Sequence, residues 1–300
     1  RIRLAAAAAQ IGLWDWNIQT GRAFYSPRYK AMLGYNEEEI GDTADEWTKR
    51  IHPEDAPGVF AAIQPYMEGK PGSATVEFRM LCKDGGWQWT MGRGMVVERD
   101  ADGRPLRMIG TNSDITERKA HDSQLEHIAH YDALTNLPNR VLLADRLQQA
   151  MAQALRRQQQ LAVAYLDLDG FKAINDHHGH ETGDQVLITL ANRMREALRE
   201  GDTLARLGGD EFVAVLIDLE DASASLPMLD RLLKAAALPV QVGERILQGS
   251  ASLGVTFYPQ AQDIDADQLL RQADQAMYQA KVAGKNRYHV FDAVQDSSVR

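Results

Sequence analysis

Hydrophobic and polar positions alternate in the first third of the chain in the way that short β-strands require. The alternation predicts a strand at 12–18 and a return strand at 22–25. Short helical patterns come next, at 27–33, 37–40 and 45–51. A longer helix is predicted from Pro53 to about Met67, since it has a proline early and acids in its first turn. Three further strand-like runs then follow, at 74–82, 87–97 and 106–113. This succession predicts an α+β layout for the region.

The pattern changes after a polar helical stretch at 116–130. Apolar residues at helical spacing predict more helices, at 140–157, 226–237 and 266–283 and from about Asp184 onward. Asn139 is suited to cap the first of these. Uninterrupted apolar runs predict buried strands, at 161–166, 204–207, 212–216, 248–258 and 287–291. The order lacks the regular alternation of a doubly wound fold, and the chain contains neither a Walker-type phosphate loop nor a Gly-x-Gly-x-x-Gly sequence. Those nucleotide-binding folds are therefore disfavoured.

Length and composition are those of a soluble protein with two domains of ordinary size. The chain has 300 residues, of which 44% are hydrophobic and 25% are charged. A formal net charge of −9 argues against a general nucleic-acid binder, whose affinity depends on neutralising phosphates. A small phosphorylated ligand that brings its own metal is compatible with this charge.

The single cysteine, Cys82, excludes an internal disulfide framework and agrees with a reducing compartment, which predicts a cytoplasmic location. No apolar run approaches the roughly 20 residues of a membrane span, so we expect no membrane contact in this chain. The chain begins without methionine, which indicates a fragment of a longer protein. That parent protein could still be anchored in an inner membrane.

A pair of acids follows a glycine turn in the second half of the chain. Gly208-Gly209 separates two predicted strands and suits a tight hairpin, because glycine tolerates the positive φ that such turns need. Asp210 and Glu211 then place two carboxylates beside the bend. Neighbouring carboxylates repel one another unless a cation offsets them, and hard oxygen ligands suit Mg²⁺. Alone, the pattern is most often that of an ordinary acidic turn, so its interpretation depends on which other segments of the chain join it.

Acids also stand at the end of the predicted strand 161–166, where Asp167 and Asp169 precede Gly170. Side chains at the carboxyl end of a buried strand are well placed to bind a ligand. A neighbouring glycine lets backbone N–H groups approach a phosphate. This segment is therefore the strongest partner for the acidic hairpin.

Residues 5–117 resemble a PAS domain. The resemblance rests on four segments: Gly12-Leu-Trp-Asp-Trp-Asn17, Leu33-Gly-Tyr35, Ile51-His-Pro-Glu-Asp55 and Asp114-Ile-Thr-Glu-Arg-Lys119. It implies a module that senses a signal or pairs with another copy, and the fold alone does not say which. His52 invites comparison with a haem ligand, but a loop or capping histidine before Pro53 is the favoured interpretation. The tryptophans Trp14, Trp16, Trp87 and Trp89 are expected in a core or a dimer surface rather than in an aromatic cage. The ligand of this domain stays unknown.

Residues 130–292 resemble a GGDEF domain, the diguanylate cyclase family. Five motifs in order carry the resemblance: Asp132-x-Leu-Thr-x-Leu-Pro-Asn-Arg140, Asp167-x-Asp-x-Phe-Lys-x-Ile-Asn-Asp176, Gly179-His-x-x-Gly-Asp184, Arg206-x-Gly-Gly-Asp-Glu-Phe212 and Lys281-x-x-Gly-Lys-Asn286. The resemblance implies an α/β fold whose central sheet is like that of nucleotide cyclases and polymerase palms. It also implies the condensation of two GTP into cyclic di-GMP and two pyrophosphates. Because each chain would offer half of the active site, a homodimer is implied as well.

The resemblance also implies roles for individual residues. The metal ligands for Mg²⁺ or Mn²⁺ would be Asp167, the Leu168 carbonyl, Asp210 and Glu211. Glu211 is either a ligand or the group that helps to deprotonate the 3′-hydroxyl, and the sequence does not separate these roles. The catalytic residues would be Asp210, Glu211 and Lys172.

Substrate contacts follow in the same way. Asn175 and Asp184 match the guanine-reading positions. The phosphates would be met by Gly170, Phe171, Lys172, Lys281 and Lys285, and His180 would touch the substrate. Many relatives carry arginine in place of Lys285 and a larger residue in place of Gly170, and lysine keeps the charge but loses the bidentate fork. The histidines at 177, 178 and 180 are expected to line or cover the nucleotide loop rather than to form a transition-metal site.

Arg199-Glu-Gly-Asp202 matches the Arg-x-x-Asp product-inhibition motif at the family's distance from the hairpin. It would bind cyclic di-GMP and slow the enzyme. The alternative interpretation of these four residues is a salt pair at a helix end.

The sequence predicts four regions: a PAS sensor domain at 1–117, a helical linker at 118–130, a GGDEF domain at 131–292 and a tail at 293–300. The segment 291–300 resembles the linker to an EAL phosphodiesterase domain. We expect a diguanylate cyclase regulated by its PAS domain. A GTP-binding regulatory domain of a cyclic di-GMP phosphodiesterase, with weak or no catalysis, stays open as the alternative. A protein that acts only through PAS-mediated interactions is a third class.

Overall fold

A computed structural model of the chain describes residues 11–293. The chain divides into two compact units between Gln124 and Leu125. Each unit is built around its own five-stranded sheet. The segment 294–300, which includes most of the predicted tail, lies outside the described residues.

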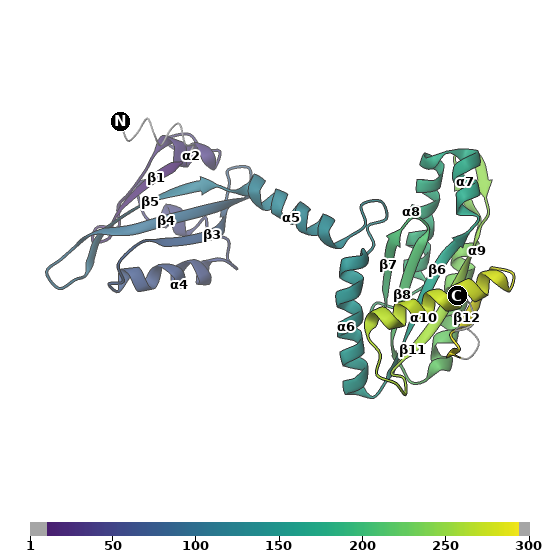
Figure 1. Cartoon of the computed structure of the whole chain (residues 1–300). Coiled ribbons are helices and arrows are strands. Elements are labelled where there is room, and N and C mark those ends of the chain that lie inside the picture. Colours follow the sequence, from purple (N-terminus) through teal and green to yellow (C-terminus); the bar gives the residue numbers. More distant parts are fainter. Residues whose placement is uncertain (1–10, 294–300) are drawn as a thin grey trace. The chain divides into compact units, whose positions relative to one another are not determined.

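The first unit is an antiparallel sheet in the order β2-β1-β5-β4-β3 (Figure 1). Its strands are β1 (Gly12–Asn17), β2 (Ala23–Tyr25), β3 (Ala74–Leu81), β4 (Trp87–Arg99) and β5 (Pro105–Asp114). The helices α2 (Pro27–Met32), α3 (Asp45–Thr48) and α4 (Ala56–Met67) lie between the two groups of strands in sequence. The five predicted strands are confirmed, and so is the α+β layout.

The apolar core of this unit lies between the helices and one face of the sheet. Tyr29 of α2 and Val59 of α4 are buried with Phe78 and Met80 of β3. Two details of the predicted helices are wrong. The segment 37–40 is a turn, and the helix expected from Pro53 begins at Ala56, because residues 53–55 form a preceding turn.

The helix α5 (Thr116–His130) follows the last strand of the first unit, as the sequence predicts. None of its residues is buried, and its apolar side chains Leu125 and Ile128 are more than half exposed. Its stability therefore depends little on packing within the described chain.

The second unit is a mixed sheet in the order β12-β11-β6-β8-β7, in which only the β11–β12 pair is parallel. Its strands are β6 (Gln160–Asp169), β7 (Thr203–Gly208), β8 (Glu211–Leu219), β11 (Ser250–Tyr258) and β12 (Tyr288–Val290). A separate hairpin of β9 (Val240–Val242) and β10 (Arg245–Leu247), and a 3₁₀ turn η1 (Ala222–Ser225), were not predicted. The helices are α6 (Arg140–Arg157), α7 (Phe171–His178), α8 (His180–Glu196), α9 (Leu226–Ala237) and α10 (Ala266–Val282).

Helices cover both faces of this sheet. On one face, α8 and α9 bury Leu187 and Leu229 against the strands. On the other, α6 and α10 bury Leu143 and Leu269, and Figure 1 shows α10 crossing that face. Gly254 of β11 lets α10 approach, because a Cβ atom there would lie 1.9 Å from the Met277 backbone nitrogen. The register of α10 on the sheet is therefore fixed by backbone contact.

Asn139 caps α6 as predicted, since its Oδ1 accepts hydrogen bonds from the backbone N–H groups of Val141 and Leu142. The C-terminal end of α10 is also capped as its sequence suggests. Gly284 has φ +118°, its N–H bonds the Lys281 carbonyl, and the Lys285 N–H bonds the Ala280 carbonyl. This closure fixes where the chain leaves α10.

Candidate functional site

The acidic hairpin lies at the end of the central strand β6. Gly208 and Gly209 have φ values of +144° and +50°, so the turn uses the conformational freedom of both glycines. Glu211 stands directly opposite Asp167 in the pairing of β8 with β6. The Leu168 N–H reaches the Asp210 carbonyl at 3.3 Å. The fold thus brings together all four predicted metal ligands from two segments that are far apart in the sequence.

The negative charges of Asp167 and Asp210 repel each other at this point. Burial, and then the neighbouring charge of Asp167, raise the pKa of Asp210 above its usual value of 3.8. The Lys281 Nζ atom lies 2.9 Å from Asp167 Oδ1. The sequence assigns Lys281 to phosphates, and the structure places it against a carboxylate at the same site. The region therefore favours an additional cation.

A divalent metal fits this set of donors. Asp167 and Asp210 supply hard carboxylate oxygens, the Leu168 carbonyl is a neutral oxygen close by, and Mg²⁺ binds through one or two carboxylates together with substrate phosphates. Within residues 11–293, no three His, Cys, Asp or Glu side chains converge into a complete metal cage. A metal at this edge would accordingly share its coordination between the protein and a ligand.

Two further titratable side chains, which the sequence analysis missed, border the acids. Burial, and then the charge of Glu211, raise the pKa of the Tyr165 hydroxyl of β6. Burial also raises the pKa of Asp274 of α10, against the opposing effect of Lys281. The spacing of these two residues in the sequence could have predicted that they lie near the acids. Tyr165 is two residues before Asp167 on the same strand face, and Asp274 is seven residues before Lys281 on the same helix face.

Asp169 holds the segment after α10 in place. Its carboxylate accepts hydrogen bonds from Ser250 Oγ at 2.6 Å and Ser252 Oγ at 2.7 Å, both on the adjacent strand β11. It also accepts one from the Asn286 N–H at 3.2 Å. Lys285, next to Asn286, has φ +61°. Asp169 therefore positions the loop that presents Lys285, a role that the sequence did not assign.

Apart from Lys281 and Lys285, the predicted phosphate and guanine residues lie on, or directly before, the two helices that follow β6. Gly170 precedes α7 with φ +79°, and the buried Phe171 begins that helix. Lys172, His180 and Asp184 are exposed on α7 and α8. A charged or polar ligand can reach all three.

Asn175 faces α8 at very short range. A Cβ atom at Gly183 would lie 1.9 Å from the Asn175 Oδ1 atom, so the absence of a side chain at 183 makes room for the amide. The Oδ1 atom is buried and has no hydrogen-bond partner among the described residues. Buried side-chain acceptors nearly always have a hydrogen-bond partner, so this atom indicates a partner that the described residues do not supply.

The Arg199–Asp202 segment forms a turn after α8. The Asp202 carboxylate accepts hydrogen bonds from the Arg199 N–H at 3.0 Å and from the Ile217 N–H at 3.1 Å. The ion pairs found among residues 11–293 do not include one between Arg199 and Asp202. Asp202 thus shapes the turn through backbone groups, and the Arg199 guanidinium is left out of that arrangement.

A charged link joins the start of the second unit to the acidic hairpin. The Arg206 guanidinium bonds both carboxylate oxygens of Asp132, at 3.0 and 2.9 Å. It also donates to the Gly209 carbonyl at 3.0 and 2.8 Å. Burial raises the pKa of Asp132, but hydrogen bonds from Thr135 and the charge of Arg206 outweigh burial and lower it. Asp132 and Arg206 therefore hold the backbone on which Asp210 stands.

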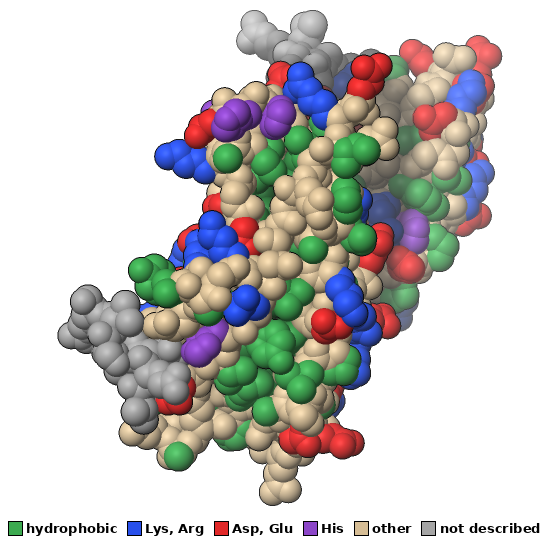
Figure 2. All heavy atoms as spheres, turned by 90° about the vertical axis from the view of Figure 1, so that its right-hand side faces the viewer, with side chains coloured by type: hydrophobic (Ala, Val, Ile, Leu, Met, Phe, Trp, Pro, Cys, Tyr) green, Lys and Arg blue, Asp and Glu red, His purple; other side chains and the backbone are tan. Residues whose placement is uncertain are grey.

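The surface of the second unit mixes charges of both signs. On the face turned toward the viewer in Figure 2, blue and red side chains are interspersed with green and tan ones. His177 of α7 uses its Nδ1 atom on the Ala173 carbonyl at 2.7 Å. On this face, an anionic ligand would therefore meet separate cations rather than a broad basic surface.

Two family models match the chain. The model described as diguanylate cyclase, GGDEF domain, matches residues 129–287. The model described as PAS fold matches residues 22–112. Each match lies within one of the two structural units.

Two curated relatives match over more than half of the chain. The chain is 42% identical over 177 residues to the bifunctional diguanylate cyclase/cyclic di-GMP phosphodiesterase MucR of Pseudomonas aeruginosa, which covers 59% of this chain and 26% of MucR. It is 42% identical over 161 residues to the diguanylate cyclase TpbB of the same species, which covers 53% of this chain and 37% of TpbB. The chain thus spans well under half of the length of these relatives.

Solved structures agree in fold. A variant of TpbB (YfiN) from Pseudomonas aeruginosa that comprises only the GGDEF domain matches with a TM-score of 0.54 and 37% identity, over 57% of this chain and 98% of that one. The coiled coil and GGDEF domain of DgcB from Caulobacter crescentus, solved with c-di-GMP, matches with a TM-score of 0.53 and 28% identity, over 59% of this chain and 93% of that one. Among residues 11–293, moreover, no helix has the length and apolar character needed to cross a membrane.

Proposed function

Since the chain belongs to the diguanylate cyclase family of GGDEF domains, we propose that it condenses two GTP molecules into cyclic di-GMP and two pyrophosphates. The meeting of Asp167, Asp210 and Glu211 at the ends of β6 and β8 carries this proposal. Membership of this family favours a nucleotide-binding site over an ordinary acidic turn as the interpretation of these acids. The same conclusion agrees with relatives named as diguanylate cyclases.

Asp167, Asp210 and the Leu168 carbonyl would hold Mg²⁺ or Mn²⁺. A divalent ion bound there lowers the pKa of a hydroxyl and offsets the charge of the phosphates. The raised pKa of Asp210 supports this assignment, because a carboxylate that is costly to ionise alone is stabilised by a cation. Glu211, close to Tyr165, is the candidate to receive the proton of the 3′-hydroxyl or to complete the metal site.

The remaining residues would bind and orient the substrate. Lys172, Lys281 and Lys285 supply positive charge for the β- and γ-phosphates, together with backbone N–H groups at Gly170 and Phe171. Lys281 would move from Asp167 to a phosphate when nucleotide and metal arrive. Asn175, with its unused Oδ1, and Asp184 would accept hydrogen bonds from the guanine N–H donors. His180 would lie beside them.

One second unit holds one GTP in this scheme, so two chains must face each other for each 3′-hydroxyl to attack the other α-phosphate. We propose a homodimer for this reason. We further propose the boundaries 1–117 for the sensor, 118–130 for the linker, 131–292 for the cyclase and 293–300 for the tail, in a cytoplasmic setting. The Asp132–Arg206 link would let a change in the linker reach the acidic hairpin. Arg199 and Asp202 are proposed to bind the product.

The decisive experiment incubates the purified chain with GTP and Mg²⁺ and follows the product by chromatography. Cyclic di-GMP is expected from the natural chain. An Asp210→Asn, Glu211→Gln variant keeps the size of both side chains and should lose activity by about 100-fold or more. Failure of the natural chain to bind GTP would contradict the assignment of this site.

A GTP-binding regulatory domain is the second candidate function. It is favoured by the similarity to MucR, whose name includes a phosphodiesterase activity, and to the cyclic di-GMP phosphodiesterase NbdA of Pseudomonas aeruginosa, at 39% identity over 172 residues. In that case GTP would bind without yielding product at any chain concentration. An EAL domain in a longer parent chain would then be the regulated partner.

A further inference from the structure

A tyrosine of β6 lies next to the acidic hairpin in the sheet of the second unit. Tyr165 and Asp167 are two residues apart in this strand, so their side chains leave the same face of it. Tyr165 pairs with Val213, two residues after Glu211 in β8, so Glu211 is its diagonal neighbour. Diagonal neighbours lie about 7–8 Å apart, within reach of an aromatic side chain. The register of the strands therefore allows the Tyr165 side chain to meet the Glu211 carboxylate.

The Tyr165 ring is held in place by packing. The residue is 8% exposed and belongs to the core cluster between the sheet, α6 and α10. Its partner on the other neighbouring strand is Gly254, whose missing side chain lets the backbone of α10 approach the sheet. Ala273 and Met277 of α10 belong to the same cluster. A ring packed in this way has little freedom to turn, so the position of its hydroxyl oxygen is fixed.

The Tyr165 hydroxyl lies close to two carboxylates. Burial, and then the charges of Glu211 and Asp274, raise the pKa of Tyr165, and the Glu211 carboxylate acts in addition as a hydrogen-bond acceptor for the hydroxyl. The phenol therefore keeps its proton at neutral pH and is a donor. Its single proton can be donated to one acid at a time. Glu211 is the acid that accepts it, whereas Asp274 is an exposed residue of α10 that acts through its charge.

The Glu211 side chain needs such a donor to have one orientation. Its backbone is fixed by pairing with Asp167, but a flexible chain of methylene groups lies between that backbone and the carboxylate. The cations at this end of the sheet are bound to other acids, since Lys281 pairs with Asp167 and Arg206 pairs with Asp132. A hydrogen bond from a fixed phenol to a carboxylate is charge-assisted, and it excludes rotamers that turn the acid away from the site.

We propose that Tyr165 is a positioning residue for the cyclase reaction: its hydroxyl donates to one carboxylate oxygen of Glu211 and keeps the other oxygen directed at the metal and the 3′-hydroxyl. The inference rests on the proposed function, in which Glu211 receives the proton or completes the metal site. Tyr165 is a buried residue, so it acts on the substrate through Glu211. The rate of the chemical step should therefore depend on this hydroxyl, and the binding of GTP should not.

Phenylalanine variants of the full chain test the contact and its role separately. Tyr165→Phe removes only the hydroxyl. Tyr258→Phe is the matched control, because Tyr258 is 7% exposed, belongs to the same core cluster and pairs with Leu161 at the opposite end of β6. Both variants are made in the natural chain and again in a Glu211→Ala chain, so that the effect of each hydroxyl is measured with and without the carboxylate.

The contact is tested by the melting temperature in a chelator, followed by circular dichroism. Tyr165→Phe should lower it by about 3 °C when Glu211 is present and by less than about 1 °C in the Glu211→Ala chain. Tyr258→Phe should shift it equally in both chains. An equal shift for Tyr165→Phe in both chains would show that the hydroxyl does not hold Glu211, and the proposal would be overturned.

The role is tested by steady-state kinetics with GTP at saturating Mg²⁺. Tyr165→Phe should lower kcat by about tenfold and change the KM for GTP less than about twofold, whereas Tyr258→Phe should change both less than about twofold. A loss confined to KM, or the same kcat for the two variants, would refute the positioning role. Absence of cyclic di-GMP from the natural chain would instead contradict the proposed function, and the melting temperatures would still decide whether Tyr165 holds Glu211.

Discussion

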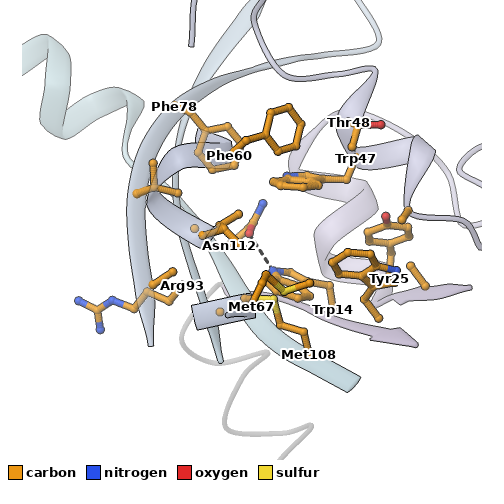
Figure 3. Close-up of a pocket in the computed structure, with 18 of the residues that line it drawn as sticks. Trp14, Tyr25, Trp47, Thr48, Phe60, Met67, Phe78, Arg93, Met108 and Asn112 are labelled. Carbon is orange, nitrogen blue, oxygen red and sulfur yellow. Dashed lines mark hydrogen bonds between the residues drawn. The ribbon is translucent and has the colours of Figure 1, made fainter. Parts of the chain in front are cut away.

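Both units are built on a five-stranded sheet, but they differ in where they leave room for a ligand. In the first unit the core lies on one side of the sheet and encloses a cavity with aromatic walls (Figure 3). In the second unit helices fill both faces, and polar side chains gather at the ends of β6 and β8. A void inside a core suits an apolar ligand, whereas the end of a fully packed sheet suits a charged one. The two five-stranded sheets are therefore suited to two kinds of ligand, one apolar and one charged.

The largest expected difference between the units concerns tolerance of added volume. Gly254→Ala would press a methyl group against the backbone of α10, at 1.9 Å from the Met277 nitrogen and 2.0 Å from the Ala273 carbonyl oxygen. We expect about 3 kcal/mol of lost stability or more. At Gly94→Ala the nearest atoms belong to side chains that border the cavity, Met108 and Trp14, both at 2.7 Å, and not to backbone, so about 1 kcal/mol is expected.

The tryptophans make this comparison measurable. All five tryptophans of the chain lie before residue 125, so their fluorescence reports on the first unit alone. Circular dichroism during thermal unfolding reports on both units. If Gly254→Ala and Gly94→Ala lost equal stability, the first unit would tolerate added volume no better than the second, which would contradict this comparison.

The second prediction concerns the link between the linker and the hairpin. Arg206→Ala removes a largely buried guanidinium and leaves Asp132 and the Gly209 carbonyl without their partner, which should cost about 2–3 kcal/mol and reduce cyclase activity. Arg157→Ala is the matched control, because the Arg157–Asp218 pair is exposed and should contribute about 0.5 kcal/mol. Chemical denaturation and product formation are measured for both. Similar values for the two variants would show that Arg206 does not hold the hairpin.

The third prediction concerns the loop that carries Lys285. Asp169→Ala removes the acceptor for Asn286 and should raise the KM for GTP by about tenfold while kcat changes less. Ser250→Ala removes one of the donors to the same carboxylate and should change KM less than about threefold. Steady-state kinetics separates the two constants. A loss confined to kcat would instead connect Asp169 to the chemical step.

The smallest effect is a gain in stability. Because burial and Asp167 raise the pKa of Asp210 above 3.8, protonation of this carboxyl is more favourable in the folded state than in the unfolded chain. The ionised carboxylate therefore destabilises the metal-free protein at neutral pH, and this cost disappears as the pH falls below 3.8. Asp210→Asn should raise the melting temperature at pH 7 in a chelator by about 2 °C, with no difference at pH 3. A lower melting temperature for the variant at pH 7 would reject this sign.

Periodicity predicted most of the elements, because long amphipathic helices and buried strands have clear signals. The hairpin at Gly208-Gly209 and the cap at Asn139 were predicted from local chemistry and are confirmed. The short strands β9 and β10 were missed because three residues carry little pattern. Local sequence also misplaced the start of α4, where an early proline and acids suit a turn as well as a helix.

The acids of the candidate site were identified from their motifs, but their surroundings were not. Tyr165, Asp169 and Asp274 acquire their environments through contacts between separate elements, which no short window contains. The cavity was equally hidden. Trp14 and Trp16 were expected in a core or a dimer surface, and they pack against the core, but only the packed structure determines that they border a void.

The most direct test of the central claim, that one second unit forms half of a GTP-condensing site, is the initial rate of cyclic di-GMP formation at increasing chain concentration. If two chains together form the site, the rate per chain rises with concentration and levels off once dimers predominate. A rate per chain that is independent of concentration down to the monomeric chain would contradict it, as would bound GTP that yields no product at any concentration.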